Sequence, residues 1–109
     1  MDKILIVFTM KGCPFCEIFK GQLKESNLEF YERDIDEHKD EYDLFVEITE
    51  NDYVPAFMIV ESPNEVPNSL LFAPGRDFEE IEEGVEIIKE HFTNHKLLRR
   101  QRKSAVILF

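Results

Sequence analysis

The chain has 109 residues, of which 43% are hydrophobic and ten are phenylalanines. This is enough to bury the core of one domain, but there is no room for a second. The net charge of −10 argues against non-specific nucleic-acid binding by the domain, because an acidic surface repels phosphates, and we expect no specific nucleic-acid partner. The apolar run Ile4–Phe8 is too short for a signal-peptide core or a membrane span. We therefore expect one globular domain in a reducing, cytoplasmic compartment.

The charge is unevenly distributed along the chain. Residues 1–92 carry 8 Lys/Arg and 23 Asp/Glu, whereas residues 93–109 carry 5 Lys/Arg and no acid. We assign residues 1–92 to the domain and residues 93–109, basic and then apolar, to a C-terminal extension. Three interpretations of the extension stay open: it folds back onto the acidic domain, it docks a partner, or it contacts a membrane surface or nucleic acid.

The first half of the chain predicts a strand, a helix, a second strand and a second helix. The first strand is expected at residues 3–9 and the second at residues 29–34. Between them, residues 14–26 predict a helix with one apolar face, formed by Ile18, Phe19 and Leu23. The next helix is expected to be capped by Asp36 and to run to about Glu50, with its apolar positions at Tyr42, Phe45, Val46 and Ile48.

The second half predicts two strands and a closing helix. Strands are expected at residues 54–60 and 69–73, separated by a turn-rich segment at residues 62–68. The last helix is expected to start with a capping box made by Asp77 and Glu80, followed by apolar residues at helical spacing: Phe78, Ile81, Val85, Ile88 and Phe92. The order βαβαββα predicts an α/β domain whose central sheet is covered by helices on both faces.

The two cysteines, Cys13 and Cys16, carry the clearest chemical signal. They stand three positions apart, between the first strand and the first helix. A C-x-x-C at the start of a helix is typical of a dithiol–disulfide redox site. The free N–H groups of the first turn favour a thiolate, Pro14 suits the first helical position, and Lys11 adds positive charge. We expect an accessible Cys13 with a pKa below the ~8.5 of a free thiol, and a less accessible Cys16 that stays protonated.

Two other interpretations of the cysteines are weaker. A zinc site would need further ligands, but there is no second C-x-x-C, and the three histidines, His38, His91 and His95, do not have ligand spacing. We therefore expect no metal. The second interpretation is that the two cysteines are unreactive core residues. Their place at a strand-to-helix turn, beside Pro14 and Lys11, makes this less favoured.

The chain resembles a dithiol glutaredoxin over residues 3 to about 92. The resemblance rests on three signatures in the family's order: Cys13-Pro14-Phe15-Cys16, then Val54-Pro55, then Gly75-Arg76-Asp77. The segment from Phe30 to Asp36 is also similar to the family's second strand and the turn after it. The resemblance implies a thioredoxin-like fold with a central four-stranded mixed sheet flanked by helices.

The resemblance also implies a glutathione site. Pro55 is expected to be cis, leaving the backbone of Val54 free to pair with glutathione or an extended peptide. Gly75, Arg76 and Asp77 would hold the γ-glutamyl end, through backbone N–H groups at a helix start and the Asp77 carboxylate. Asp77 could instead simply be an N-cap. Phe15 and Lys11 are the other two residues expected to bind glutathione.

Two departures from the family pattern affect this site. The family's glutathione-binding lysine usually lies three residues before the first cysteine, where this chain has Met10, so Lys11 is displaced by one position. The family often has two glycines before the Asp, and here the first is Pro74. The thioredoxin signature Trp-Cys-Gly-Pro-Cys and the monothiol Cys-Gly-Phe-Ser type are both absent.

The resemblance implies a monomeric, glutathione-dependent thiol–disulfide oxidoreductase that acts on protein disulfides or glutathionyl mixed disulfides. Cys13 would attack the substrate and Cys16 would resolve the mixed disulfide. One alternative is a protein reduced by thioredoxin reductase that donates electrons to an enzyme such as ribonucleotide reductase. The other is a non-catalytic adaptor that docks through residues 93–109.

Overall fold

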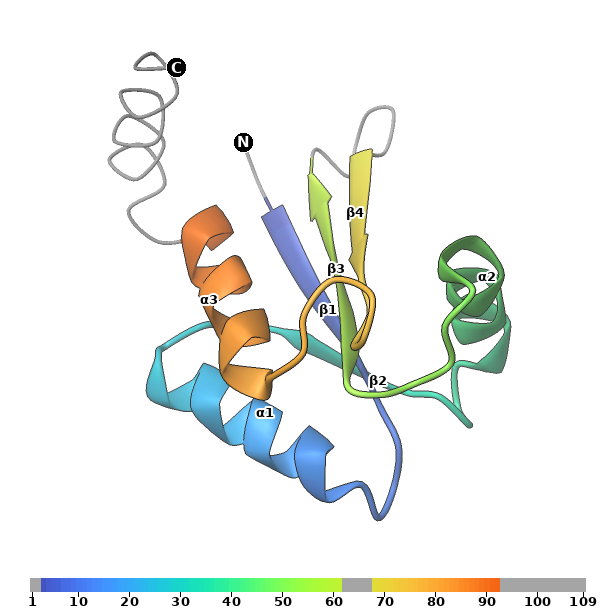
Figure 1. Cartoon of the computed structure of the whole chain (residues 1–109), viewed down its shortest axis with the longest axis horizontal. Helices are drawn as coiled ribbons and strands as arrows, with labels where there is room; N and C mark the ends of the chain where they lie inside the picture. Colours follow the sequence, from blue (N-terminus) through green and yellow to red (C-terminus); the bar gives the residue numbers. More distant parts are fainter. Residues whose placement is uncertain (1–2, 62–67, 93–109) are drawn as a thin grey trace.

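The computed structural model describes residues 3–61 and 68–92, and it contains four strands and three helices in the expected order (Figure 1). The expected turn at residues 62–68 falls almost entirely outside the described residues, and the C-terminal extension falls wholly outside them. The elements are β1 (Lys3–Thr9), α1 (Pro14–Glu25), β2 (Tyr31–Asp34), α2 (Lys39–Thr49), β3 (Ala56–Glu61), β4 (Asn68–Phe72) and α3 (Ile81–Phe92).

The four strands form one mixed sheet in the order β2-β1-β3-β4. β1 runs parallel to β2, which places Ile6 opposite Tyr31, and antiparallel to β3, which places Ile6 opposite Met58. β3 and β4 form an antiparallel pair. The expected α/β fold with a four-stranded mixed sheet is confirmed.

Helices cover both faces of this sheet. α1 and α3 lie on one face and α2 on the other (Figure 1). Leu5 and Val7 of β1 join the core on the α1–α3 face, and Ile6 and Phe8 join the core on the α2 face. A strand buried on both faces needs a continuous apolar run rather than an alternating pattern, and residues 4–8 supply one.

α2 begins later than the sequence suggested. It starts at Lys39, and its N-cap, His38, makes no side-chain capping bond, so the expected Asp36 cap is wrong. The Asp36 N–H instead donates to Asp34 Oδ1 at 2.9 Å, and this local turn competes with the helix start. Ile48, expected on the apolar face, is 60% exposed.

α3 also begins later than expected, at Ile81, so the expected capping box between Asp77 and Glu80 is wrong. The Glu83 carboxylate accepts the backbone N–H groups of Glu79 at 2.7 Å and Glu80 at 3.0 Å. These two bonds hold the pKa of Glu83 below its ordinary value, the Glu80 bond contributing most. Residues 74–80 are therefore a loop that precedes the helix.

Gly84 allows α3 to lie close to its neighbours. A Cβ at this position would meet the rings of Phe19 and Phe78 at 3.3 Å. These distances are shorter than ordinary van der Waals contact. The missing side chain therefore lets α3 pack closely against Phe19 of α1 and against the ring of Phe78.

Tyr42 on α2 is buried against Phe8 and Phe45. Its hydroxyl has no hydrogen-bond partner among the described residues. Burial, assisted by the charges of Asp52 and Asp43, raises the pKa of Tyr42 to about 12. Since an ordinary Tyr ionises near ~10, Tyr42 favours the folded state fully below pH ~10, and this contribution is lost as the pH rises toward 12.

We expect Tyr42→Phe to leave the free energy of unfolding at pH 7 unchanged or raised by up to about 1 kcal/mol, because it removes an unpaired buried hydroxyl. The variant should lose less stability than the wild type between pH 7 and pH 11. Urea unfolding at both pH values measures this, with Tyr53→Phe, which removes a phenol that is 66% exposed, as the control. A loss of more than about 1 kcal/mol in Tyr42→Phe at pH 7 would show that the hydroxyl has a partner.

Candidate active site

The two cysteines lie where β1 delivers the chain to the first turn of α1. They form a disulfide, and their Cα atoms are 5.2 Å apart. Cys13 is the N-cap of α1, and its Sγ accepts the Cys16 N–H at 3.1 Å. Pro14 is the first residue of the helix. In the reduced protein, the same N–H and the helix N-terminus would stabilise a thiolate at Cys13.

Cys13 is more exposed to solvent than Cys16, as expected, but the difference in exposed fraction is small. Cys13 is 7% exposed and Cys16 is fully buried. Phe15, between them, is 63% exposed. The pair is therefore accessible to solvent from the Cys13 side, which the exposed Phe15 ring adjoins.

The segment before β3 contains the expected cis bond, between Val54 and Pro55. The backbone N–H and C=O of Val54 form no hydrogen bond with any described residue. The Asn51 side chain braces this segment, because its Oδ1 accepts the Tyr53 N–H at 3.0 Å and its Nδ2 donates to the Pro74 carbonyl at 2.8 Å. A backbone held in place with unpaired polar groups can pair with an extended peptide.

A groove of about 440 Å³ adjoins the cysteine turn. α1 contributes Phe15 and Ile18 to its lining, and the segment before β3 contributes Val54 and Pro55. The remaining lining residues come from the loop at residues 74–80 and the start of α3: Pro74, Phe78, Glu79, Glu80, Ile81 and Glu82. Ile18 is 48% exposed, so its expected place on the buried face of α1 is wrong. The structure thus brings three of the predicted site residues, Phe15, Val54 and Pro55, into one groove.

Gly75, Arg76 and Asp77 lie in the loop that borders this groove, but their backbone is already hydrogen-bonded. The Gly75 N–H donates to the Phe78 carbonyl at 2.7 Å, and the N–H groups of Arg76 and Asp77 donate to Ala73 at 3.2 and 2.9 Å. They are not free helix-start donors, as the sequence suggested. Asp77 Oδ2 accepts the Ala73 N–H at 2.8 Å and an Arg76 Nη1–H at 3.1 Å, so Asp77 fixes the loop. Contact with glutathione at these three residues stays a prediction.

Lys11 lies in the turn between β1 and Cys13, and its side chain is exposed to solvent. Its Nζ lies 3.9 Å from Glu37 Oε2, and both side chains are largely exposed. A surface pair of this kind is weak, so Lys11 can still meet a ligand. That role also stays a prediction.

A polar network behind the cysteine turn was not expected from the sequence. Thr9, buried at the end of β1, donates its hydroxyl to Glu32 Oε2 at 2.7 Å, and Lys20 Nζ donates to the same oxygen at 2.9 Å. The Thr9 bond, followed by that of Lys20, holds the pKa of Glu32 below its ordinary value. The network ties α1 and β2 to the strand end that carries Cys13.

Other side chains in the groove were also missed. The sequence pattern predicts a helix for the acidic residues after Asp77 and no role in the site, although Glu79, Glu80 and Glu82 line the groove. The sequence does indicate a concentration of negative charge here, since four of the five residues 79–83 are glutamates. Within residues 3–61 and 68–92, no group of three or more His, Cys, Asp or Glu is arranged to hold a metal ion, and none of the helices there is long and apolar enough to cross a membrane.

Comparison with protein families identifies a match over the first part of the chain. A protein-family model described as Glutaredoxin matches residues 5–61, just over half of the 109-residue chain. The match runs from β1 through the cysteine turn to the end of β3, and therefore includes Val54-Pro55. No curated protein matches the chain significantly.

We expect iodoacetamide to modify Cys13 alone in the reduced protein at pH ~6, because the α1 N-terminus and the Cys16 N–H favour its thiolate. Mass spectrometry of labelled peptides across pH gives the midpoint for each cysteine. Lys11→Gln should raise the Cys13 midpoint only slightly, since an exposed charge is screened by solvent. A Cys13 midpoint near ~8.5 would show that the thiol is not activated.

Proposed function

The chain belongs to the glutaredoxin family, and from this membership and its disulfide-forming cysteine pair we propose that it reduces protein disulfides and glutathionyl mixed disulfides, with glutathione as the electron donor. Family and cysteine pair together indicate a thiol–disulfide oxidoreductase. The observation that carries the proposal is the Cys13–Cys16 pair at the N-terminus of α1, beside a groove lined by Val54 and cis-Pro55.

In the first step, the Cys13 thiolate attacks one sulfur of the substrate disulfide. A bond forms between Cys13 Sγ and that sulfur, the substrate S–S bond breaks, and the other sulfur leaves as a thiolate that takes a proton from solvent. Val54 supports this step, because its unpaired N–H and C=O can pair with the substrate backbone and hold the attacked sulfur in place.

In the second step, Cys16 loses its proton to solvent and attacks Cys13 Sγ. The Cys13–Cys16 bond forms, the mixed disulfide breaks, and the second substrate thiolate leaves and is protonated. Two electrons have then passed from the cysteine pair to the substrate. The first turn of α1 fixes the two cysteines at a separation, 5.2 Å between Cα atoms, that a disulfide spans readily.

Two molecules of glutathione then return the pair to the dithiol and become glutathione disulfide. The Val54 backbone and the apolar sides of Phe15 and Pro55 support glutathione as the substrate of this step, whereas the three carboxylates of the groove do not. Arg76, in the loop that borders the groove, and Lys11, in the turn before Cys13, do not line the groove, but they are the cations that we propose meet the glutathione carboxylates.

A second candidate, reduction by thioredoxin reductase, is favoured by two features of the chain. The family's usual lysine is replaced by Met10, and the groove is lined by three carboxylates and no Lys or Arg. Glutathione carries two carboxylates and one ammonium, so this lining does not attract it. A protein reductase would need no tripeptide site.

We expect Cys13→Ser to abolish turnover in a glutathione-coupled assay with hydroxyethyl disulfide, because no nucleophile remains. Cys16→Ser should retain removal of glutathione from a mixed disulfide, yet lose at least about 10-fold in the reduction of protein disulfides, since no second thiol resolves the intermediate.

The electron donor is decided by recycling the oxidised wild type with either glutathione plus glutathione reductase, or thioredoxin reductase with NADPH. Recycling by glutathione supports the proposal, and recycling by thioredoxin reductase alone supports the second candidate. Full activity in Cys13→Ser would contradict both.

A further inference from the structure

We propose that the groove beside the disulfide selects protein substrates that carry an apolar residue and Lys or Arg next to the reactive cysteine. This inference rests on the proposed function and names the substrate class of the same site. It makes Glu79 and Glu80 specificity-determining residues.

Part of the groove lining is apolar. This part combines the exposed Phe15 and Ile18 of α1 with Val54, Pro55 and Pro74. An exposed aromatic ring beside an exposed isoleucine is the kind of surface that binds an apolar side chain. A substrate chain paired with the Val54 backbone would direct alternate side chains toward this surface.

The rest of the lining comes from residues 78–82 and contains three carboxylates, two of which have no partner among the described residues. Glu79 and Glu80 make no side-chain ion pair or hydrogen bond with any described residue. The third, Glu82, accepts only a neutral hydrogen bond, from Gln22 Nε2 at 3.2 Å. The groove therefore presents negative charge that no described cation neutralises.

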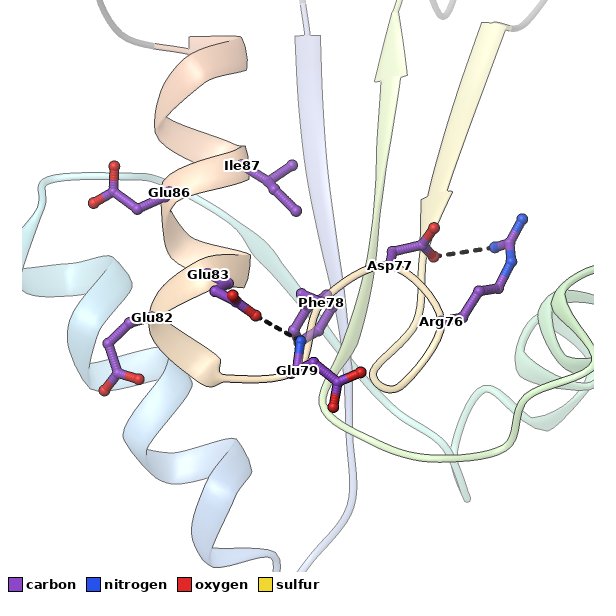
Figure 2. A pocket seen from close by; sticks show the side chains of 8 residues that line it. All are labelled: Arg76, Asp77, Phe78, Glu79, Glu82, Glu83, Glu86 and Ile87. Atoms are coloured by element: carbon purple, nitrogen blue, oxygen red, sulfur yellow. Dashed lines mark hydrogen bonds and ion pairs between the residues drawn. The ribbon is translucent and has the colours of Figure 1, made fainter.

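The negative charge continues along α3 in an adjoining hollow that shares Phe78, Glu79 and Glu82 with the groove. Glu83 and Glu86 line this hollow as well, and Figure 2 shows Glu82 and Glu86 projecting from the same side of α3. Arg76 is the one cation lining the hollow, and it is paired with Asp77 at 3.1 Å and points away from α3 (Figure 2). A substrate reaching past the groove would meet further carboxylates.

Charge complementarity then favours a basic segment. Each exposed pair contributes a small amount, about 2- to 5-fold in rate or affinity, and much of it acts on the association rate. Two or three such pairs together would give about a 10-fold preference that weakens as salt is added.

The test uses two peptides of equal length, each closed into a ring by one disulfide and each with Leu beside the first cysteine. One carries two Lys next to that cysteine, and the other carries two Glu. The fully reduced, full-length protein is mixed with each peptide in a single turnover, and the second-order rate constant of peptide thiol release is measured. No reductant takes part, so the result is independent of how the protein is recycled.

We expect the Lys peptide to react about 10-fold faster than the Glu peptide at low salt, with the ratio falling toward 1 at about 0.5 M salt. The double variant Glu79→Gln/Glu80→Gln should reduce the ratio to about 3-fold or less. Its matched control, Glu29→Gln/Glu47→Gln, removes two exposed charges outside the groove and should keep the full ratio.

Equal rates for the two peptides, or equal ratios in the two double variants, would overturn the inference while leaving the oxidoreductase activity in place. Equal rates that become unequal after removal of residues 93–109 would also overturn it, because the basic extension, and not a substrate, would then pair with the carboxylates of the groove. If neither peptide is reduced at all, the proposed function itself fails.

Discussion

The burial of β1 on both faces is the constraint on which the rest of this structure depends. Val7 and Phe8 are fully buried, one facing α1 and α3 and the other facing α2. A strand packed on both faces and paired on both edges cannot shift in register by one residue without moving every side chain into the opposite core and misfitting both. The residue that follows its end is thereby fixed in space, and the cysteine turn begins there.

Three separate segments converge on that end of the sheet. β1 brings the cysteine turn, the segment before β3 brings Val54 and Pro55, and the loop before α3 brings Pro74 to Glu80. Asn51 links the second and third segments through its bond to the Pro74 carbonyl, and Thr9 with Glu32 and Lys20 stabilises the first. The site is thus assembled from loops that rigid elements hold in position, which is the common arrangement for reactive groups.

The sequence was sufficient for the features that depend on local chemistry. The order of the elements was predicted, because strand and helix periodicity and turn residues are recognised at short spacing. The cis bond at Pro55 was expected only because the chain resembles the glutaredoxin family. The start of α3 was not predicted, since residues 77–83 repeat the same acid spacing. The bonds of Asp77 to Ala73 and of Glu83 to the Glu79 and Glu80 N–H groups exclude the earlier start. Ile18 and Ile48 were wrongly placed, because a short helix with apolar residues on two sides does not reveal which side faces the core.

The most direct test of the central claim is an equilibrium titration of the cysteine pair in buffers of varied glutathione and glutathione disulfide. Alkylation and intact mass then count the free thiols in the folded protein. The account predicts a reversible transition in which two thiols appear together, with a potential in the glutaredoxin range of about −200 to −230 mV. A pair that stays oxidised at every ratio until the protein is unfolded would contradict it, because Cys13 and Cys16 would then be a structural disulfide.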